Sequence, residues 1–415
     1  MPAMRTRAAL CALIGLFCLL PRVGMAGEGD YRITPWLGTS LSYSNEMFDR
    51  QEHVTNKVAR MLRARADGRL EEGVLYVGGR FAGSRIWEET NTPGKFPILS
   101  RFPPTHTRGR SDGYGVINEI SFNATMVMPL ATLFLQGEYT EIEYPGQEPV
   151  QLRKYWLVLG DLRAAPFYLA LGRKTVSFGN FATYAPFTHN HSSHYFWSQS
   201  DAPVIELGYV TERTEIVATA IPAHRGLRVL NTPSNNGALS NFALNASHRF
   251  EFSEGRSLTV GGGWLKGTIY DSTLAHHPPA TGINPFWNGA WDVNATYSTP
   301  RFDVMAEFTR TINDWPATFH HVQATTVQGR MRGRLAGRPA AYSLTASRGV
   351  QGARGTEWER MEQVILGVEV DVAPHLRIGA EYMYNAGFVP LILPLIAGDR
   401  SVVSHTVILG AELTF

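Results

Sequence analysis

Cysteine is nearly absent from this chain of 415 residues. It has two, Cys11 and Cys18, and both lie in the first 26 residues. If that stretch is removed, the remaining chain has no thiol. Disulfide scaffolds, cysteine nucleophiles and cysteine-ligated zinc are then excluded.

Residues 1–26 have the pattern of a secretory signal peptide. Arg5 and Arg7 precede an apolar run from Ala8 to Leu20, and small residues follow it up to Ala26. The run, of about 13 residues, is shorter than a membrane-spanning helix requires. We expect cleavage after Ala26 and a mature chain of residues 27–415.

An excess of positive charge is also lacking. The chain has 38 Lys and Arg against 36 Asp and Glu, and three of the arginines (Arg5, Arg7 and Arg22) lie in the leader, which has no acid. The mature chain therefore has a net charge near zero, whereas a nucleic-acid partner requires a clear basic excess. We expect no nucleic-acid partner.

After the leader no uninterrupted apolar run reaches the length of a transmembrane helix. We also find no proline- or serine-rich linker and no block of like charge, so residues 27–415 are expected to form one domain. Catalytic patterns such as G-x-S-x-G, H-E-x-x-H and the P-loop are missing as well. The sequence predicts no enzyme and no cofactor, although an outer-membrane enzyme or an adhesin remain alternatives.

Alternating strands are what the chain does contain. The final stretch SHTVILGAELTF alternates with period two. One face carries Val407, Leu409, Ala411, Leu413 and Phe415, and the other carries Thr406, Ile408, Gly410, Glu412 and Thr414, where the glutamate indicates contact with water. Similar alternation recurs in 114–128, 290–297 and 362–372. In a membrane barrel the apolar face meets lipid and the polar face lines the lumen.

The lengths of the connections favour a membrane barrel over a soluble sandwich. Short turns at 162–166, 211–213, 253–256, 298–300, 336–339 and 373–375 alternate with long loops such as 88–113, 176–203 and 271–289. Outer-membrane barrels have short periplasmic turns and long extracellular loops. We predict an all-β transmembrane antiparallel barrel of about 16–18 strands in the bacterial outer membrane. The first two of eighteen candidate strands are 33–43 and 57–69.

Three arginines alternate along 328–335, where Arg330, Arg332 and Arg334 share one face. An arginine facing lipid near the bilayer midplane costs about 2–4 kcal/mol, so these side chains are expected to point into the lumen. The other predicted pore-lining residues are Arg173, Arg80, Glu119, Glu307 and Glu381. These charges either pair across a wide lumen or create an anion-favouring path.

The stretch 176–203 is an aromatic and histidine-rich loop. We expect it to fold toward the pore as a constriction that contains Phe178, Phe181, Tyr184, His189, His191, His194 and Trp197. The histidine spacing is also compatible with a metal site, but zinc needs three or four fixed ligands. The prediction is a selectivity element without metal.

Three Asn-x-Ser/Thr sequences, 123–125, 245–247 and 294–296, match the glycan-acceptor pattern. In each, the strand alternation places the asparagine and the hydroxyl on the inner face and the central alanine on the outer face. We interpret them as lumen wall.

The stretches LVLGDLRAAPFYLALGRKTVSFGNF (157–181), APVIELGYV (202–210) and WDVNATYSTPRFDVMAEFTRTIND (291–314), with the terminal Phe415, resemble the LbtU-type siderophore porins. The resemblance implies passage of a ferric siderophore without a plug domain. The lumen charges leave another small anionic solute as a candidate cargo, and a general or anion-selective porin is the alternative function. The resemblance also implies outer-membrane lipid and the barrel-assembly machinery as further partners, with Phe415 as the assembly terminus. Members of the family often carry an amino-terminal helical segment, which the sequence pattern does not predict here.

Overall fold

The structure is a computed structural model of the chain. It describes residues 31–96, 109–141, 149–200, 202–222, 239–253, 255–270, 287–389 and 398–415. The predicted signal peptide, residues 1–26, lies outside the described residues, as do parts of the long loops.

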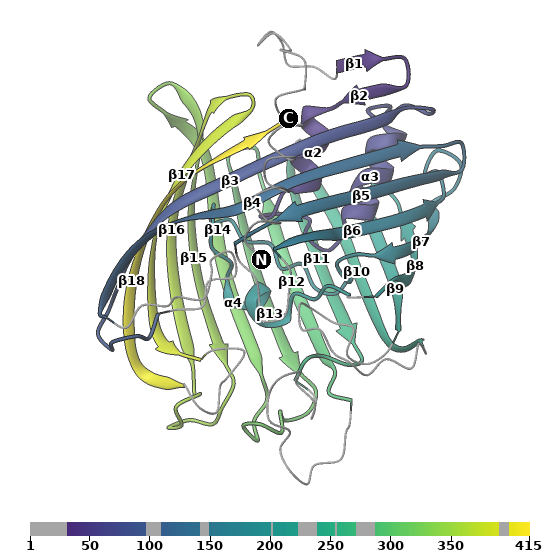
Figure 1. Cartoon of the computed structure of the whole chain (residues 1–415). Helices are drawn as coiled ribbons and strands as arrows, with labels where there is room; N and C mark the ends of the chain where they lie inside the picture. The colour runs from purple at the N-terminus through teal and green to yellow at the C-terminus, as the bar shows by residue number, and fades with distance from the viewer. Residues whose placement is uncertain are drawn as a thin grey trace, which may run out of the picture.

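Sixteen antiparallel strands form a closed barrel, β3 to β18 (Figure 1). Each strand pairs with the next in the chain, and β18 pairs with β3 to close the circle. The predicted transmembrane β-barrel is confirmed with sixteen strands. Their bounds are β3 (Leu75–Thr90), β4 (Ser111–Val127), β5 (Ala131–Tyr139), β6 (Val150–Leu159), β7 (Phe167–Arg173), β8 (Val204–Val210), β9 (Thr214–Pro222), β10 (Leu239–Ser253), β11 (Arg256–Leu265), β12 (Ala290–Ser298), β13 (Phe302–Thr311), β14 (Gln323–Leu335), β15 (Arg338–Val350), β16 (Met361–Ala373), β17 (Leu376–Phe388) and β18 (Asp399–Thr414).

The connections alternate in length as the sequence predicts. Tight turns, such as Ala336–Gly337 between β14 and β15, gather at one end of the barrel, and long loops gather at the other (Figure 1). In outer-membrane barrels the short-turn end faces the periplasm.

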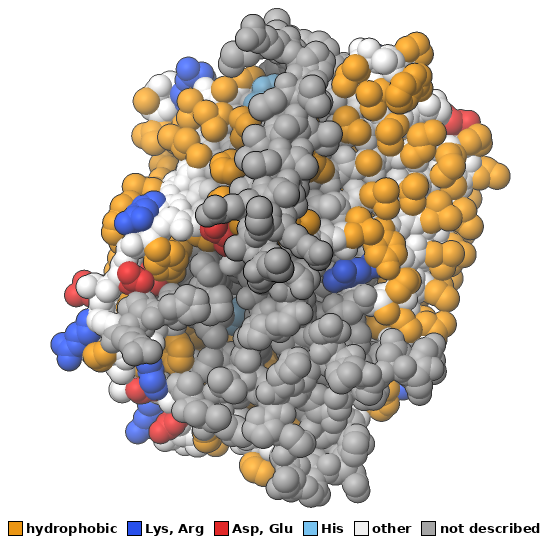
Figure 2. Space-filling view, viewed as in Figure 1, with side chains coloured by type: hydrophobic (Ala, Val, Ile, Leu, Met, Phe, Trp, Pro, Cys, Tyr) orange, Lys and Arg blue, Asp and Glu red, His pale blue; other side chains and the backbone are white. Residues whose placement is uncertain are grey.

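The outer face of the barrel is apolar and the inner face largely polar. On β18, Val407 and Leu409 are 41% and 48% exposed, whereas Ser404 and Thr406, which lie on the other face of the strand, are buried. Figure 2 shows hydrophobic side chains spread over the strands. Within the described ranges, no helix combines the length and the apolar character needed to cross a bilayer.

The predicted strands 33–43 and 57–69 are wrong. The chain here forms a short hairpin, β1 (Tyr31–Thr34) and β2 (Leu37–Thr39), and then two helices, α2 (Leu41–Phe48) and α3 (Lys57–Ala66). The sequence KVARMLRARA consists mainly of strong helix formers with one β-branched residue, so local propensity favours the helix. The helical segment that the sequence pattern failed to predict is present.

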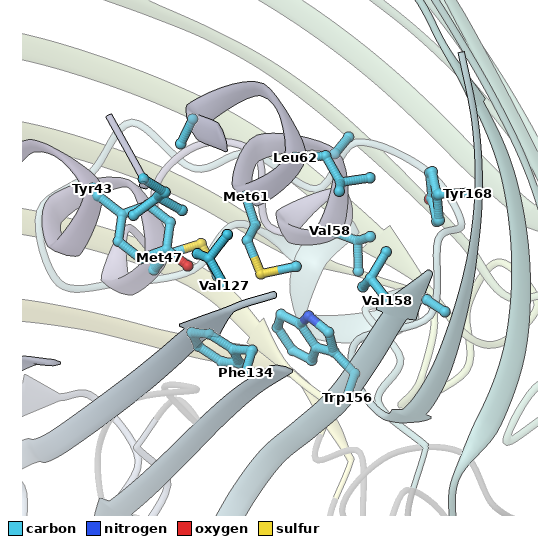
Figure 3. Close-up of a cluster of buried hydrophobic side chains, with 14 of the residues drawn as sticks. Tyr43, Met47, Val58, Met61, Leu62, Val127, Phe134, Trp156, Val158 and Tyr168 are labelled. Atoms are coloured by element: carbon cyan, nitrogen blue, oxygen red, sulfur yellow. The ribbon is translucent and has the colours of Figure 1, made fainter. Parts of the chain in front are cut away.

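The two helices lie inside the barrel near the short-turn end (Figures 1 and 3). They bury Tyr43, Met47, Val58, Met61 and Leu62 against inward-facing side chains of the wall, among them Phe134, Trp156, Val158 and Tyr168. The rings of Phe134 and Trp156 stack with centroids 4.2 Å apart. We call residues 41–70 the amino-terminal insert. It fills part of the lumen that the sequence predicted to be free of a plug.

Candidate functional site: the lumen and its two inserts

The chain between β7 and β8, residues 174–203, lies largely inside the barrel. We call it the lumen loop. Its first anchor is Glu206 of β8, whose buried carboxylate accepts hydrogen bonds from Ser177 Oγ at 2.9 Å and from Tyr168 at 2.8 Å, and pairs with Lys174. This carboxylate is fully satisfied by the loop and the wall, so it fixes the point where the loop leaves β7.

The second anchor lies across the lumen, on β13 and β14. Glu307 Oε1 accepts hydrogen bonds from the backbone N–H groups of Asn180 and Phe181, both at 2.9 Å. Gln328 accepts one from Tyr184 N–H at 3.0 Å and donates one to the carbonyl of Ala182 at 2.8 Å. These side chains supply the partners that a strand would otherwise provide to a buried backbone.

The third anchor is a bay on the inner faces of β16, β17 and β18. A Cβ atom on Gly379 would lie 3.1 Å from the Phe187 ring, and one on Gly410 would lie 2.5 Å from it. The absence of side chains there admits the ring. Beside the bay, Glu381 accepts hydrogen bonds from the N–H of Phe187 and, at 3.0 Å, from the N–H of Thr188. The lumen loop therefore reaches from β7 to β18.

The histidine-rich part of the loop returns along the inner wall as α4 (His191–Phe196), capped by Asn190. His191 is buried, and its Nδ1 lies 3.2 Å from Ser347 Oγ of β15. His194 is buried against the ring of Tyr195, and His189 Nδ1 lies 3.1 Å from Ser193 Oγ. In the part of the chain that the structure describes, no cluster of three or more His, Cys, Asp or Glu is arranged to hold a metal ion.

The aromatic residues of the loop do not all face open space. Phe178 and Phe181 are fully buried, with ring centroids 5.7 Å apart, and Trp197 is half-buried. They pack with Val204, Ile221 and Trp315 in a cluster toward the long-loop half of the barrel. Tyr184 is the aromatic residue of the predicted set that borders a cavity.

The lumen loop and the amino-terminal insert meet inside the barrel. The N–H of Thr183 donates to the carbonyl of Gln51 at 2.7 Å. Thr55 Oγ1 donates to the carbonyl of Gly179 at 2.9 Å, and Ser177 Oγ lies 3.0 Å from the carbonyl oxygen of Thr55. Two segments far apart in the sequence thus form one continuous structure across the lumen.

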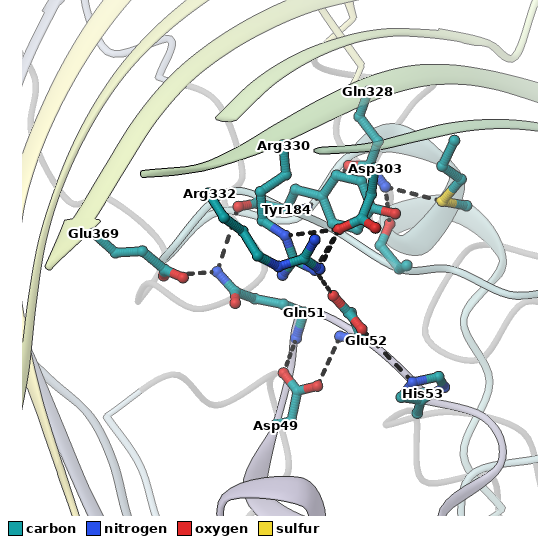
Figure 4. A network of polar contacts seen from close by, with 12 residues as sticks. Asp49, Gln51, Glu52, His53, Tyr184, Asp303, Gln328, Arg330, Arg332 and Glu369 are labelled. Atoms are coloured by element: carbon teal, nitrogen blue, oxygen red, sulfur yellow. Dashed lines mark hydrogen bonds and ion pairs between the residues drawn. The ribbon is translucent and has the colours of Figure 1, made fainter. Parts of the chain in front are cut away.

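A charged cluster lies at this junction (Figure 4). Asp303 Oδ2 pairs with Arg330 Nη2 at 2.9 Å and with Arg332 Nη2 at 2.5 Å, and Arg330 also pairs with Glu52. The Arg330 guanidinium lies 4.7 Å above the ring of Tyr184. Burial and the Asp303 carboxylate raise the pKa of the Tyr184 phenol above its usual value, which keeps the hydroxyl neutral.

Several other predicted pore residues hold the inserts in place. Arg80 contacts Glu412 at 2.5 Å and the carbonyl of Phe48, and Glu119 accepts a hydrogen bond from Arg50 at 2.6 Å. Burial opposes the charge of Arg50, but Glu119 and Glu138 outweigh it and raise the pKa of Arg50. Glu307 and Glu381, as described above, bind backbone of the lumen loop.

Two of the predicted arginines are placed differently from this group. Arg334 is exposed at the short-turn end and donates to the carbonyl of Gly337 at 2.8 Å. Arg173 shares the outward alternation of β7 with Leu171 and Leu169, and its guanidinium contacts the carbonyls of Leu152 and Ser200. The prediction of Arg173 as a pore-lining residue is corrected, because the strand alternation carries its side chain away from the lumen.

A cavity of about 1130 Å³ lies inside the barrel. It lies between α3, the underside of the lumen loop and the inner faces of β10 to β13. Arg332, Asp303 and Tyr184 border it, as do Asn245 and Asn294 of two of the three Asn-x-Ser/Thr sequences. The interpretation of those sequences as lumen wall is confirmed.

Helix α3 presents a basic face to this cavity. Arg63 pairs with Glu215 of β9, and Arg60 lies against His53. Burial and the neighbouring Arg60, Lys57 and Arg63 lower the pKa of His53, so the imidazole is neutral at physiological pH. A smaller cavity of about 270 Å³ lies on the other side of the insert, between Arg50, Arg330, Glu369 and Phe187.

The carboxy-terminal Phe415 lies at the seam of the barrel. Its N–H donates to the carbonyl of Gly79, and its own carbonyl accepts from the N–H of Gly79, both at 3.0 Å. Its ring lies edge-on to Phe122, with centroids 6.3 Å apart. The residue therefore extends the β18–β3 pairing that closes the barrel.

Strand alternation did not predict the amino-terminal insert or the wall beneath it. The available signal was in β5 and β6, where Phe134, Trp156 and Val158 are apolar on the face that alternation assigns to the lumen. A strand that is apolar on both faces inside a membrane barrel requires a partner within the lumen.

Comparisons with known proteins give the fold. No family model and no curated protein matches this chain. OprB of Pseudomonas putida superposes with a TM-score of 0.55 at 13% identity over 81% of this chain and 94% of that protein. The anion-selective porin of Comamonas acidovorans gives 0.53 at 10% identity over 82% and 99%. The outer membrane channel DcaP of Acinetobacter baumannii gives 0.52 at 12% identity over 82% and 97%.

The chain thus has the fold of the bacterial outer-membrane porins. Together with the apolar outer face, this fold places the barrel in the bacterial outer membrane.

Proposed function

We propose that this protein is a non-catalytic channel for the passive passage of small solutes across the outer membrane. The observation that carries the proposal is the polar cavity of about 1130 Å³ inside the barrel, bounded by the lumen loop. A barrel that served only as a scaffold would need neither a wall of hydrogen-bonding groups nor a loop anchored across its interior.

Within this channel the predicted residues have two roles. Tyr184, Arg330 and Arg332 form the narrow part beside Asp303, where a passing solute meets charge and an aromatic ring. Glu307 and Glu381 position the lumen loop, and Phe178, Phe181, His191 and His194 form its packed body. Phe415 at the seam is suited to recognition by the barrel-assembly machinery.

The resemblance to LbtU-type porins makes a ferric siderophore the finer candidate for the solute. An anion-favouring path is less well supported, because Arg330 and Arg332 are both paired with carboxylates. A ferric siderophore in this channel would therefore bind through neutral groups, or would displace the carboxylates from Arg330 and Arg332.

The test is a recording of the purified protein in a planar bilayer, first in salt and then with a ferric siderophore and its iron-free form. Steady conductance supports the channel, and block by the iron chelate that exceeds block by the free form supports the siderophore. Absence of conductance from correctly folded barrel would contradict the proposed function. Enzymatic turnover lost on one polar substitution would favour a catalytic barrel instead.

A further inference from the structure

The middle of the inner faces of β10, β11 and β12 carries small uncharged polar side chains, with Arg249, Glu251 and Asp292 at its margins. The strands contribute Asn245, Ser247, Ser257, Thr259, Asn294 and Thr296 to the large cavity. We call these six residues the neutral wall. The three strands are adjacent in the barrel, with Gly261 paired to Asn294 and to Ser247 at the centre of the wall.

The hydroxyl groups of the neutral wall are available. Among the described residues, Ser247, Thr259 and Thr296 make no hydrogen bond to another protein group through their side chains. Asn245, by contrast, accepts a hydrogen bond from Gly179 N–H, and Asn294 donates one to Asp292. Free hydroxyls on a wet wall can exchange their water for hydroxyl groups of a solute, because each can donate and accept.

The charges around the same cavity balance. Six arginines and six carboxylates border it. Arg63 pairs with Glu215, Arg332 with Asp303, and Arg213 with Glu251. A charged solute that enters gives up hydration and gains little from those arginines that already pair with carboxylates.

We propose that the neutral wall selects an uncharged, hydroxyl-rich solute of the size of a small saccharide. This inference rests on the proposed channel function and names its substrate class. The volume of about 1130 Å³ slightly exceeds the roughly 300–1,000 Å³ of common ligand sites. A small polyol therefore fits with part of its water shell and bonds to the wall as it passes.

The experiment compares two solutes of matched size, mannitol and sodium gluconate, by swelling of liposomes that contain the purified protein. Mannitol is expected to enter several-fold faster than gluconate, and the reversal potential in a potassium chloride gradient is expected to lie near zero. Equal or faster entry of gluconate, or a strongly anion-selective reversal potential, overturns the inference while leaving the channel function intact. Absence of both swelling and conductance overturns the channel function itself.

Two variants test which groups are responsible. Thr259→Val with Thr296→Val removes two free hydroxyls at nearly constant volume and is expected to slow mannitol entry with little change in salt conductance. Thr325→Val, on the outward face of β14, is the matched control and should leave both unchanged. Unaltered mannitol entry in the double variant contradicts the role of the wall, and normal salt conductance shows that the barrel has folded.

Asp303→Asn tests the charge balance. It leaves Arg332 without its carboxylate and Arg330 with Glu52 alone, so gluconate entry and anion selectivity should both rise. If neither rises, the neutralisation of these arginines does not control the solute class.

Discussion

The two halves of the inner wall differ in chemistry. On β5 to β8 the lumen side carries Phe134, Trp156, Val158 and Tyr168, and the amino-terminal insert covers it. On β10 to β12 it carries asparagine, serine and threonine, and a cavity adjoins it. In this barrel the apolar inner face is covered by the insert, and the neutral polar face adjoins the cavity.

The largest effect is expected from removing the amino-terminal insert. If a short glycine–serine linker replaces residues 41–70, the lumen beside β5 to β8 opens and single-channel conductance should rise several-fold in planar bilayers. A linker of the same kind in place of the turn Ala336–Gly337 is the control, since that turn lies outside the lumen. Unchanged conductance in the first variant would mean that the insert does not limit the path.

Trp156→Ala tests how much the packing between the wall and the amino-terminal insert contributes to stability. Removing this buried ring, which stacks on Phe134, should lower the free energy of unfolding by about 3–5 kcal/mol. Thermal or denaturant unfolding in detergent measures the loss. Thr259→Ala on the neutral wall is the counterpart and should change stability little; equal losses in the two variants would remove the distinction between the halves.

Glu381→Ala tests the anchoring of the lumen loop. The substitution leaves the N–H groups of Phe187 and Thr188 without their acceptor, at a cost of about 1–3 kcal/mol. Unfolding in detergent should report this loss, and the open-channel current should flicker as residues 186–188 loosen. Glu362→Ala, on a half-exposed side chain of the outward face at the start of β16, serves as control. If the Glu381→Ala channel shows no added flicker and no loss of stability, the packing of Phe187 against Gly379 and Gly410 is enough to hold the loop.

The smallest effect expected is on the pH dependence of stability. Burial lowers the pKa of His191 to about 4, whereas the unfolded imidazole titrates near 6.5. Because the folded state holds the neutral form, protonation favours the unfolded state, and stability should fall as the pH drops from about 6.5 to 4. His191→Gln should reduce the difference in melting temperature between pH 7.5 and pH 4.5. An identical pH profile in the two proteins would contradict this contribution.

The barrel was predictable from the sequence because period-two alternation and the alternation of loop lengths are local signals. After the first two, the remaining sixteen of the eighteen candidate strands each correspond to an observed strand, and the alternating stretch 290–297 lies within β12. Trp156 and Val158 are buried by the amino-terminal insert, which is distant from them in sequence. Their own strand therefore gave no direct indication of this partner.

The interior of the lumen was predictable only in part. The inward placement of Arg330 and Arg332 could be predicted from the free-energy cost of an arginine in lipid. The entry of the lumen loop into the barrel could be predicted from its content of aromatic residues. The pairing of each charge could not be deduced, since Glu52, Asp303 and Arg330 meet only after the insert has folded. The outward position of Arg173 depends on the register of β7, which a one-residue shift reverses.

The attachment of the insert determines how the barrel can be assembled. β2 pairs in parallel with the start of β3, Leu37 with Leu75 and Gly38 with Tyr76. The chain therefore leaves the rim and returns to it at a single place. The described strand pairs of the wall, up to β18 with β3, include no residue of 41–70, so the hydrogen bonding that closes the barrel does not depend on the backbone of the insert.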